Sequence, residues 1–144
     1  MLLSAGERSD DPEPVAARLR SIDEKTDSSY VLLAQGNGRL TGYVDVSILP
    51  YRRGSRTGYV VIGVRADAQG NGVGRALMHA ATERARDIGL RRLELTVVTY
   101  NHAAIALYLG AGFQVEGLRL ASIDHHGIPI DEYYMGLVLE AGTI

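Results

Sequence analysis

The chain has 144 residues, of which 46% are hydrophobic and 22% are charged, a composition typical of one globular domain. Its 15 basic and 17 acidic residues give a formal charge of −2, which argues against nucleic acid or an acidic membrane surface as a partner. Because the sequence has no cysteine, it excludes disulfides, thiolate metal sites and a cysteine acyl-enzyme. The lack of a long apolar run or a signal-peptide pattern favours a cytoplasmic location.

We expect a single domain over residues 1–144, with a loose N-terminus at residues 1–10, where neither periodicity is visible. The first predicted element is a helix over residues 11–24. Asp11 can cap its N-terminus and Pro12 suits the first helical position. The helix presents one apolar stripe, formed by Val15, Leu19 and Ile22.

Two strands follow, at residues 30–34 and 40–49, and residues 36–38 between them tolerate a positive φ, so a hairpin is predicted. A polar loop over residues 50–58 carries Arg52, Arg53 and Arg56. These arginines are suited to an anionic ligand such as a phosphate or an acidic substrate. The simpler interpretation, a solvated turn between strands, is favoured because arginines are mostly exposed.

The chain then forms a predicted strand at residues 59–64, a glycine-rich loop and a helix at residues 72–88 that Gly89 ends. The first N–H groups of a helix lack intrahelical partners and carry partial positive charge, so glycines there allow a phosphate to approach. The loop lacks the Gly-Lys-Ser/Thr ending of a Walker loop. Arg75 stands where a dinucleotide fingerprint needs its third glycine. The alternative is a glycine-rich turn without a ligand.

The second half of the chain predicts a strand at residues 91–98, a short helix at 103–109 that Asn101 can cap, and an anchoring aromatic at Phe113. Two further strands are predicted at residues 114–123 and 131–139, around a turn at residues 125–129. His125 and His126 are adjacent and would face opposite ways on a strand, so they do not predict a metal site.

Two motifs together resemble one family. Gln69-x-x-Gly72-x-Gly74 is similar to the diphosphate-binding loop of the GCN5-related N-acetyltransferases. The segment from Asn101 to Phe113 matches the N-x-x-A-x-x-L-Y-x-x-x-G-F signature of the same family, one helix and one strand later. The resemblance covers roughly residues 11–140. The ending around residues 116–135 resembles the branch that acts on amino acids, protein N-termini or small amines.

The resemblance implies an α/β fold with a twisted mixed sheet, flanked by helices, in which two parallel strands splay apart to admit acetyl-coenzyme A. It implies that the glycine loop holds the diphosphate, that strand 62–64 pairs with the pantetheine arm, that Asn101 bonds this arm, and that Tyr108 approaches the sulfur. Taken singly, Asn101 is an ordinary cap and Tyr108 a core aromatic. The residues so assigned to cofactor binding are Ile62, Gly63, Val64, Gln69, Gly70, Asn71, Gly72, Val73, Gly74, Arg75, Asn101 and Tyr108.

Tyr108 is the expected general acid. The general base is open, because Thr96 stands where N-terminal acetyltransferases of this group carry a glutamate. Glu94, on the same strand face as Thr96, is the candidate we assign, and Asp45 or a water chain are alternatives. An ordinary exposed position is the competing interpretation of Glu94.

The predicted function is direct transfer of an acetyl group from acetyl-coenzyme A, with no metal, to a primary amine of a small molecule, amino acid or peptide N-terminus. The alternative is a non-catalytic acyl-coenzyme A sensor or interaction module. Compared with the family, the strand and helix that open the fold look shortened. Either the chain is a truncated form or another subunit covers the sheet edge left exposed, because unpaired edge strands promote association. Of these alternatives, we expect a homodimer.

Overall fold

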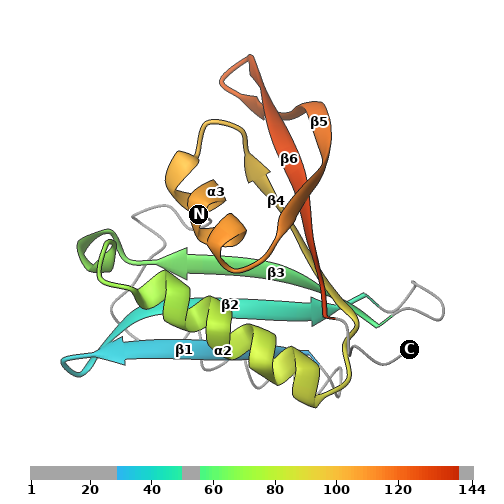
Figure 1. The fold of residues 1–144 in the computed structure, drawn as a ribbon. Helices are drawn as coiled ribbons and strands as arrows, with labels where there is room; N and C mark the ends of the chain where they lie inside the picture. The colour runs from blue at the N-terminus through green and yellow to red at the C-terminus, as the bar shows by residue number, and fades with distance from the viewer. Residues whose placement is uncertain (1–28, 50–55, 140–144) are drawn as a thin grey trace.

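The structure, a computed structural model, describes residues 29–49 and 56–139 (Figure 1). The predicted N-terminus, the helix at 11–24 and the arginines at 52 and 53 lie outside the described residues. The elements in chain order are β1 Tyr30–Gly36, β2 Arg39–Ile48, β3 Thr57–Val64, the 3-10 turn η1 Ala66–Ala68, α2 Val73–Asp87, β4 Arg92–Val98, α3 His102–Gly110, β5 Gln114–His125 and β6 Ile128–Val138.

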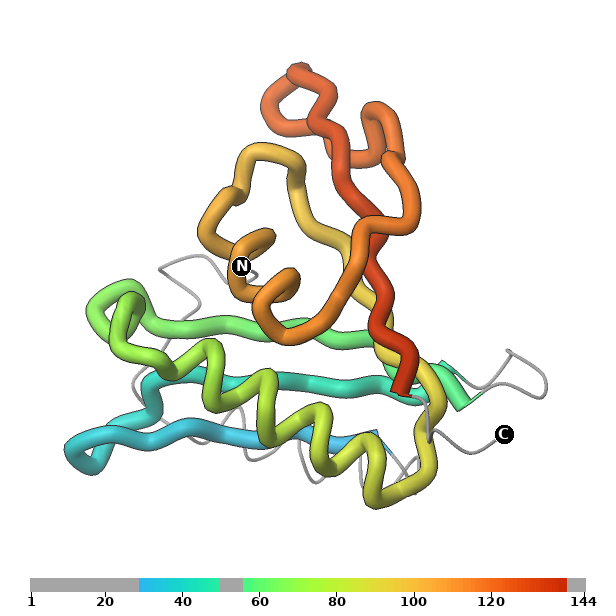
Figure 2. Tube along the Cα trace, viewed as in Figure 1, coloured from blue at the N-terminus to red at the C-terminus, as the bar shows by residue number. Residues whose placement is uncertain are grey.

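The described strands form one six-stranded mixed sheet in the order β1-β2-β3-β4-β6-β5. All neighbours are antiparallel except β3 and β4, which run parallel and pair only from Thr57 to Tyr59 on β3. Beyond Tyr59 the two strands separate, and β4 turns away from β3 with α3 in the opening between them (Figures 1 and 2). The predicted α/β fold with a splayed mixed sheet is therefore confirmed.

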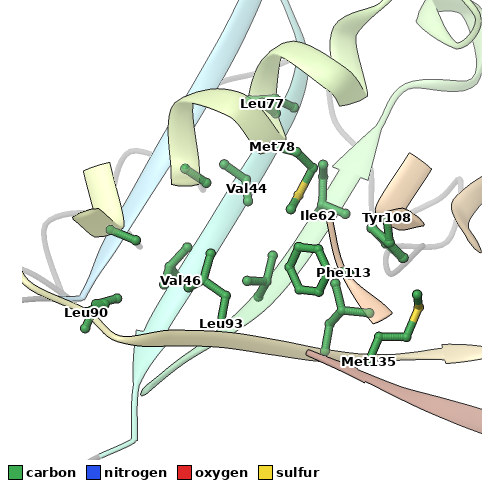
Figure 3. Close-up of a cluster of buried hydrophobic side chains, with 14 of the residues drawn as sticks. Val44, Val46, Ile62, Leu77, Met78, Leu90, Leu93, Tyr108, Phe113 and Met135 are labelled. Carbon is green, nitrogen blue, oxygen red and sulfur yellow. The ribbon is translucent and has the colours of Figure 1, made fainter. Parts of the chain in front are cut away.

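The core lies between the sheet and its two described helices. Helix α2 crosses β1 to β3 and buries Leu77 and Met78 against Val44 and Ile62 (Figure 3). Phe113, the anchoring aromatic expected from the sequence, is 1% exposed and packs near Tyr108, with 6.1 Å between the ring centroids. This packing fixes the position of α3 at the mouth of the opening.

Helix α2 ends as the sequence predicts, because Gly89 adopts a left-handed φ of 84° and the Leu90 N–H donates to the Ala85 carbonyl at 2.9 Å. The Arg56 guanidinium donates to the carbonyls of Ile88 and Gly89, both at 2.8 Å. A cation at this end complements the helix dipole. Arg56 thus caps α2, a role that neither sequence-based interpretation of the arginine loop included.

The hairpin between β5 and β6 is tighter than expected. Only His126 and Gly127 form its turn, with left-handed φ angles of 52° and 83°, and the Asp124 carboxylate accepts the Gly127 N–H at 2.8 Å. Both strands therefore extend into the segment predicted as a turn, and Pro129 pairs with Asp124 inside the ladder.

Buried Tyr30 gives a testable pH dependence of stability. Its hydroxyl donates to the Ala81 carbonyl of α2 at 2.6 Å, and burial raises the pKa of this phenol above its usual range. The folded state therefore keeps a proton that the unfolded chain loses near pH ~10, so stability present below that pH is lost as pH rises. We expect the free energy of unfolding, measured with urea, to fall more between about pH 8 and pH 11 for the wild type than for Tyr30→Phe. Tyr30→Phe should itself cost about 1 kcal/mol at neutral pH. Identical pH profiles would contradict this assignment.

Candidate active site

The glycine-rich loop joins β3 to α2 through η1. Gly70 and Gly72 adopt left-handed φ angles of 83° and 84°, and a Cβ atom at either position would meet nothing within 4 Å. Gly72 is the N-cap of α2, no side chain caps this end, and the first intrahelical bond runs from the Ala76 N–H to the Gly72 carbonyl. The helix therefore presents its first N–H groups beside open space, as an anion site requires.

Gln69 connects the glycine-rich loop to β3. Its side-chain amide donates to the Val64 carbonyl at the end of β3, at 3.3 Å, so the first residue of the motif ties the loop back to the strand. At the start of the loop, Arg65 forms an ion pair with Asp67, at 3.2 Å from Nε to Oδ1. Hydrogen bonding from Arg65 lowers the pKa of the Asp67 carboxyl, although this exposed pair adds little stability.

One cavity, which we call the loop cavity, has a volume of about 360 Å³. Its walls come from the end of β3, the glycine loop, the start of α2 and α3. It brings together nine of the twelve residues predicted to bind the cofactor. Its lining residues are Ile62, Val64, Gln69, Gly70, Gly72, Gly74, Arg75, Asn101, Ala103, Ala104, Leu107 and Tyr108.

The other three predicted residues do not line this cavity. Val73 packs against the core, and Asn71 is exposed on the loop. Gly63 pairs with Tyr43 of β2, and a Cβ atom on Gly63 would lie 2.6 Å from the Tyr43 ring. A glycine at position 63 is therefore explained by packing against that ring.

A second cavity, which we call the strand cavity, has a volume of about 350 Å³ and lies where β3 and β4 separate. Its lining residues are Tyr59, Val60, Val61, Ile62, Thr96, Val97, Val98, Tyr100, Asn101, Tyr108, Ile123 and Glu132. Ile62, Asn101 and Tyr108 line both cavities. The two hollows therefore meet at these three residues.

Asn101 is positioned by its own helix. Its side-chain oxygen accepts the Ala104 N–H at 3.1 Å and so caps α3. The capping bond uses the side-chain oxygen, and the amide group carries two further protons that can donate to a ligand. The cap and the ligand-binding interpretations of Asn101 are therefore compatible.

Tyr108 lies at the junction of the cavities and is 6% exposed. Burial raises the pKa of its phenol to about 12, and nearby Tyr59 adds to the rise. The Tyr59 hydroxyl shares a hydrogen bond of 2.9 Å with the Thr96 hydroxyl. The junction therefore holds a protonated phenol, and the hydroxyls of Tyr59 and Thr96 belong to residues that line the strand cavity.

Glu94 and Asp45, the two carboxylates considered as bases, do not line either cavity. Glu94 is 3% exposed and accepts a hydrogen bond from the Arg92 guanidinium at 3.0 Å. It lies opposite Tyr59, in the last pair that joins β3 to β4, and so at the closed end of the opening. Asp45 is also buried and accepts the Ser47 hydroxyl at 3.1 Å.

Sequence reasoning missed most of the strand cavity, including its polar residues Tyr59, Tyr100 and Glu132, and three residues of α3 in the loop cavity. Strand alternation places Glu132 on one face of β6, but only the register opposite Val98 brings it beside β4. Among the described residues, no group of three or more potential metal ligands occurs. No helix in the described ranges is both long and apolar enough to cross a membrane.

The fold and the two joined cavities define a class of protein in which a cleft between splayed parallel strands meets the open, uncapped N-terminus of a helix. The model of the acetyltransferase (GNAT) family matches residues 2–113, so the chain belongs to this family. The resemblance seen in the sequence is confirmed.

Several known proteins are similar to the chain. It is 38% identical over 110 residues to the N-alpha-acetyltransferase RimI of Mycobacterium tuberculosis, with 76% of this chain and 66% of that protein covered. It is 36% identical to the mycothiol acetyltransferase of Cellulomonas flavigena, with 78% of this chain and 36% of that protein covered. A phosphinothricin acetyltransferase from Sinorhizobium meliloti, solved in complex with acetyl-coenzyme A, has a TM-score of 0.77 at 25% identity, covering 92% and 72% of the two chains. The chain thus spans less than two thirds of either curated relative.

Proposed function

We propose that this protein transfers the acetyl group of acetyl-coenzyme A directly to a primary amine. The observation that carries the proposal is the meeting of the two cavities at Ile62, Asn101 and Tyr108. One cavity has the features of an anion site and the other is free of them, so donor and acceptor can enter separately and meet at one point. Membership of the family supports acetyl-coenzyme A as the donor, and so does the similarity to the Sinorhizobium meliloti enzyme that was solved with this molecule bound.

The loop cavity fits the diphosphate of coenzyme A. Gly70 and Gly72 leave room for it, the uncapped first turn of α2 supplies N–H donors, and Arg75 adds a positive charge. Beyond Tyr59, no described strand pairs with the β4 side of β3, so its backbone is open for an extended pantetheine arm. Asn101 is placed to bond the same arm through its amide protons.

When bound, acetyl-coenzyme A supplies an acetyl thioester that an amine can attack. We assign to Tyr108 the delivery of a proton from its hydroxyl to the departing sulfur. Its pKa of about 12 keeps the phenol protonated over the whole neutral range. Desolvation raises the pKa of a thiol as well as that of the phenol, so the transfer becomes favourable where the departing sulfur loses more solvation than the phenol oxygen.

Glu94 stays a prediction as the general base. Its ion pair with Arg92 and its place at the closed end of the opening require a chain of hydroxyls or waters to connect it to an acceptor nitrogen. Because Glu132 is the one carboxylate among the described residues that line either cavity, these features support the alternative function, a non-catalytic acyl-coenzyme A sensor. Tyr108 at the junction favours the enzyme.

Release of free thiol from acetyl-coenzyme A, measured with a panel of amino acids, polyamines, aminoglycosides and short peptides, tests the proposal. The enzyme should give release above the amine-free rate with at least one acceptor. Tight binding of coenzyme A without turnover across the panel would support the sensor. The names of the two curated relatives favour an N-terminal or small-molecule amine as acceptor.

The homodimer stays a prediction, as does the cytoplasmic location. Light scattering at micromolar concentration tests the dimer, with an expected mass twice that of the 15.6 kDa chain. A single species at 15.6 kDa would contradict it.

A further inference from the structure

We propose that Glu132 selects the acceptor by charge, binding the ammonium group of a positively charged amine that has no carboxylate beside it. Such acceptors include amino acid amides, polyamines and peptide N-termini, whereas free amino acids are disfavoured. The inference rests on the proposed function and specifies the chemistry of its acceptor.

Glu132 is the one acidic side chain among the described residues that line the strand cavity. It lies on β6 opposite Val98 of β4 and Arg119 of β5, and its side chain is 13% exposed. A carboxylate at this burial is screened less by water than a surface charge and so acts strongly on a cation that reaches it.

The remaining walls also suit a cation. Tyr59, Tyr100 and Tyr108 line the same cavity, and the faces of aromatic rings attract ammonium groups. No lysine, arginine or histidine is among the described lining residues, so a carboxylate on the acceptor has no charged partner there. The cavity volume of about 350 Å³ is in the range of small-molecule sites.

An irregularity in β5 holds Glu132 in place. The register shifts between Arg119 and Ile123, and Ala121 within this bulge adopts a left-handed φ of 53°. That conformation is strained for a residue with a Cβ atom. The Ala121 N–H donates to the Asp131 carboxylate at 2.7 Å, which helps to maintain the bulge.

The bulge places two residues at the cavity. The Ser122 hydroxyl donates to Oε1 of Glu132 at 2.9 Å, and Ile123 lines the cavity wall. Bulges often redirect side chains beside active sites, and strained backbone persists where the surroundings hold it. Because the strain accompanies an oriented carboxylate, we assign the bulge the role of positioning Glu132.

Arg119 forms a long ion pair with the Glu132 carboxylate. Its Nη1 is 3.5 Å from Oε1, at the limit of a hydrogen bond, and its side chain is 48% exposed and lies over the Tyr134 ring. Both contacts of the carboxylate use Oε1, and Oε2 makes no hydrogen bond with any described residue. Oε2 is therefore the atom that receives the acceptor ammonium.

The test compares alaninamide, a cation at neutral pH, with alanine, a zwitterion of nearly the same shape. Calorimetric titration of each into the protein saturated with coenzyme A should show tighter binding of alaninamide by the wild type, by at least about tenfold. Glu132→Gln, which keeps the Ser122 hydrogen bond, should weaken alaninamide binding about 10- to 100-fold and remove the preference. Glu83→Gln, an exposed carboxylate on α2 paired with Arg86, makes the same change of charge elsewhere and should have no effect.

The outcomes separate the two proposals. Loss of coenzyme A binding in Glu132→Gln would indicate a misfolded variant. In that case Glu132→Asp, which keeps the charge, must bind both coenzyme A and alaninamide, or the inference fails. If coenzyme A binds and amines are acetylated, but alaninamide and alanine bind equally or alaninamide does not bind, this inference is wrong and the function stands. If the wild type does not bind coenzyme A, both the proposed function and the role of Glu132 are wrong.

The positioning role of Ser122 has its own readout. Ser122→Ala should raise the KM for alaninamide several-fold and leave kcat unchanged, and Ser122→Thr, which restores a hydroxyl, should rescue the KM. An unchanged KM in Ser122→Ala would contradict the proposal that the bulge positions Glu132 through Ser122.

Discussion

Tyr108→Phe is expected to lower kcat by roughly 10²- to 10⁴-fold, the usual contribution of a positioned general acid, and to change acetyl-coenzyme A affinity by no more than a few-fold. The variant removes only the hydroxyl, so the ring still packs near Phe113 at a centroid distance of 6.1 Å. Thiol release measures kcat, and calorimetry measures the affinity.

The pH profile and a control variant make this result specific. With a phenol pKa of about 12, Tyr108 should retain its proton well above neutral pH, so a loss of activity near pH ~9 must come from another group. Tyr133→Phe removes a hydroxyl from a residue of β6 that lines neither cavity and should keep the parental kcat. If Tyr108→Phe turns over at the parental rate, Tyr108 is a packing residue and the mechanism loses its acid.

Gly72→Glu should weaken coenzyme A binding by at least about tenfold. A side chain at Gly72 extends into the open space where the diphosphate is proposed to lie, and its carboxylate repels that group. The left-handed φ of 84° adds strain in the variant. Calorimetric titration with coenzyme A measures the effect.

Gly127→Glu is the matched control for strain. Gly127 has nearly the same φ, 83°, and equally open surroundings, but it lies in the hairpin turn between β5 and β6. Both variants should lose similar stability, and only Gly72→Glu should lose affinity. Equal affinities for coenzyme A in the two variants would contradict the placement of the diphosphate.

The glycine loop and the start of α3 were predictable because their determinants are local. A left-handed φ at Gly72, the end of α2 at Gly89 and the cap of Asn101 on Ala104 each depend on residues within a few positions. The same local rules predicted the turn through Asn37 and Gly38, whose φ angles are 55° and 77°. Such features determine most of the loop cavity.

The strand cavity depends on contacts that sequence periodicity does not specify. Alternation correctly puts Glu94 and Thr96 on one face of β4, but it does not say that β3 and β4 separate after the pair formed by Tyr59 and Glu94. That point of separation leaves Glu94 outside the cavity and Thr96 inside it. Glu132 reaches the cavity only through the register of β6 against β4 and through the bulge at Ala121.

The most direct test of the central claim, that the two cavities are the donor and acceptor sides of one acetyl transfer site, is a crystal structure of the protein with acetyl-coenzyme A. We expect the diphosphate against the backbone of residues 70–75, the pantetheine arm along β3 at residues 62–64, and the acetyl group beside Tyr108, facing the strand cavity. A complex in which the acetyl group lies away from Tyr108, or in which the diphosphate binds outside the glycine loop, would contradict the account.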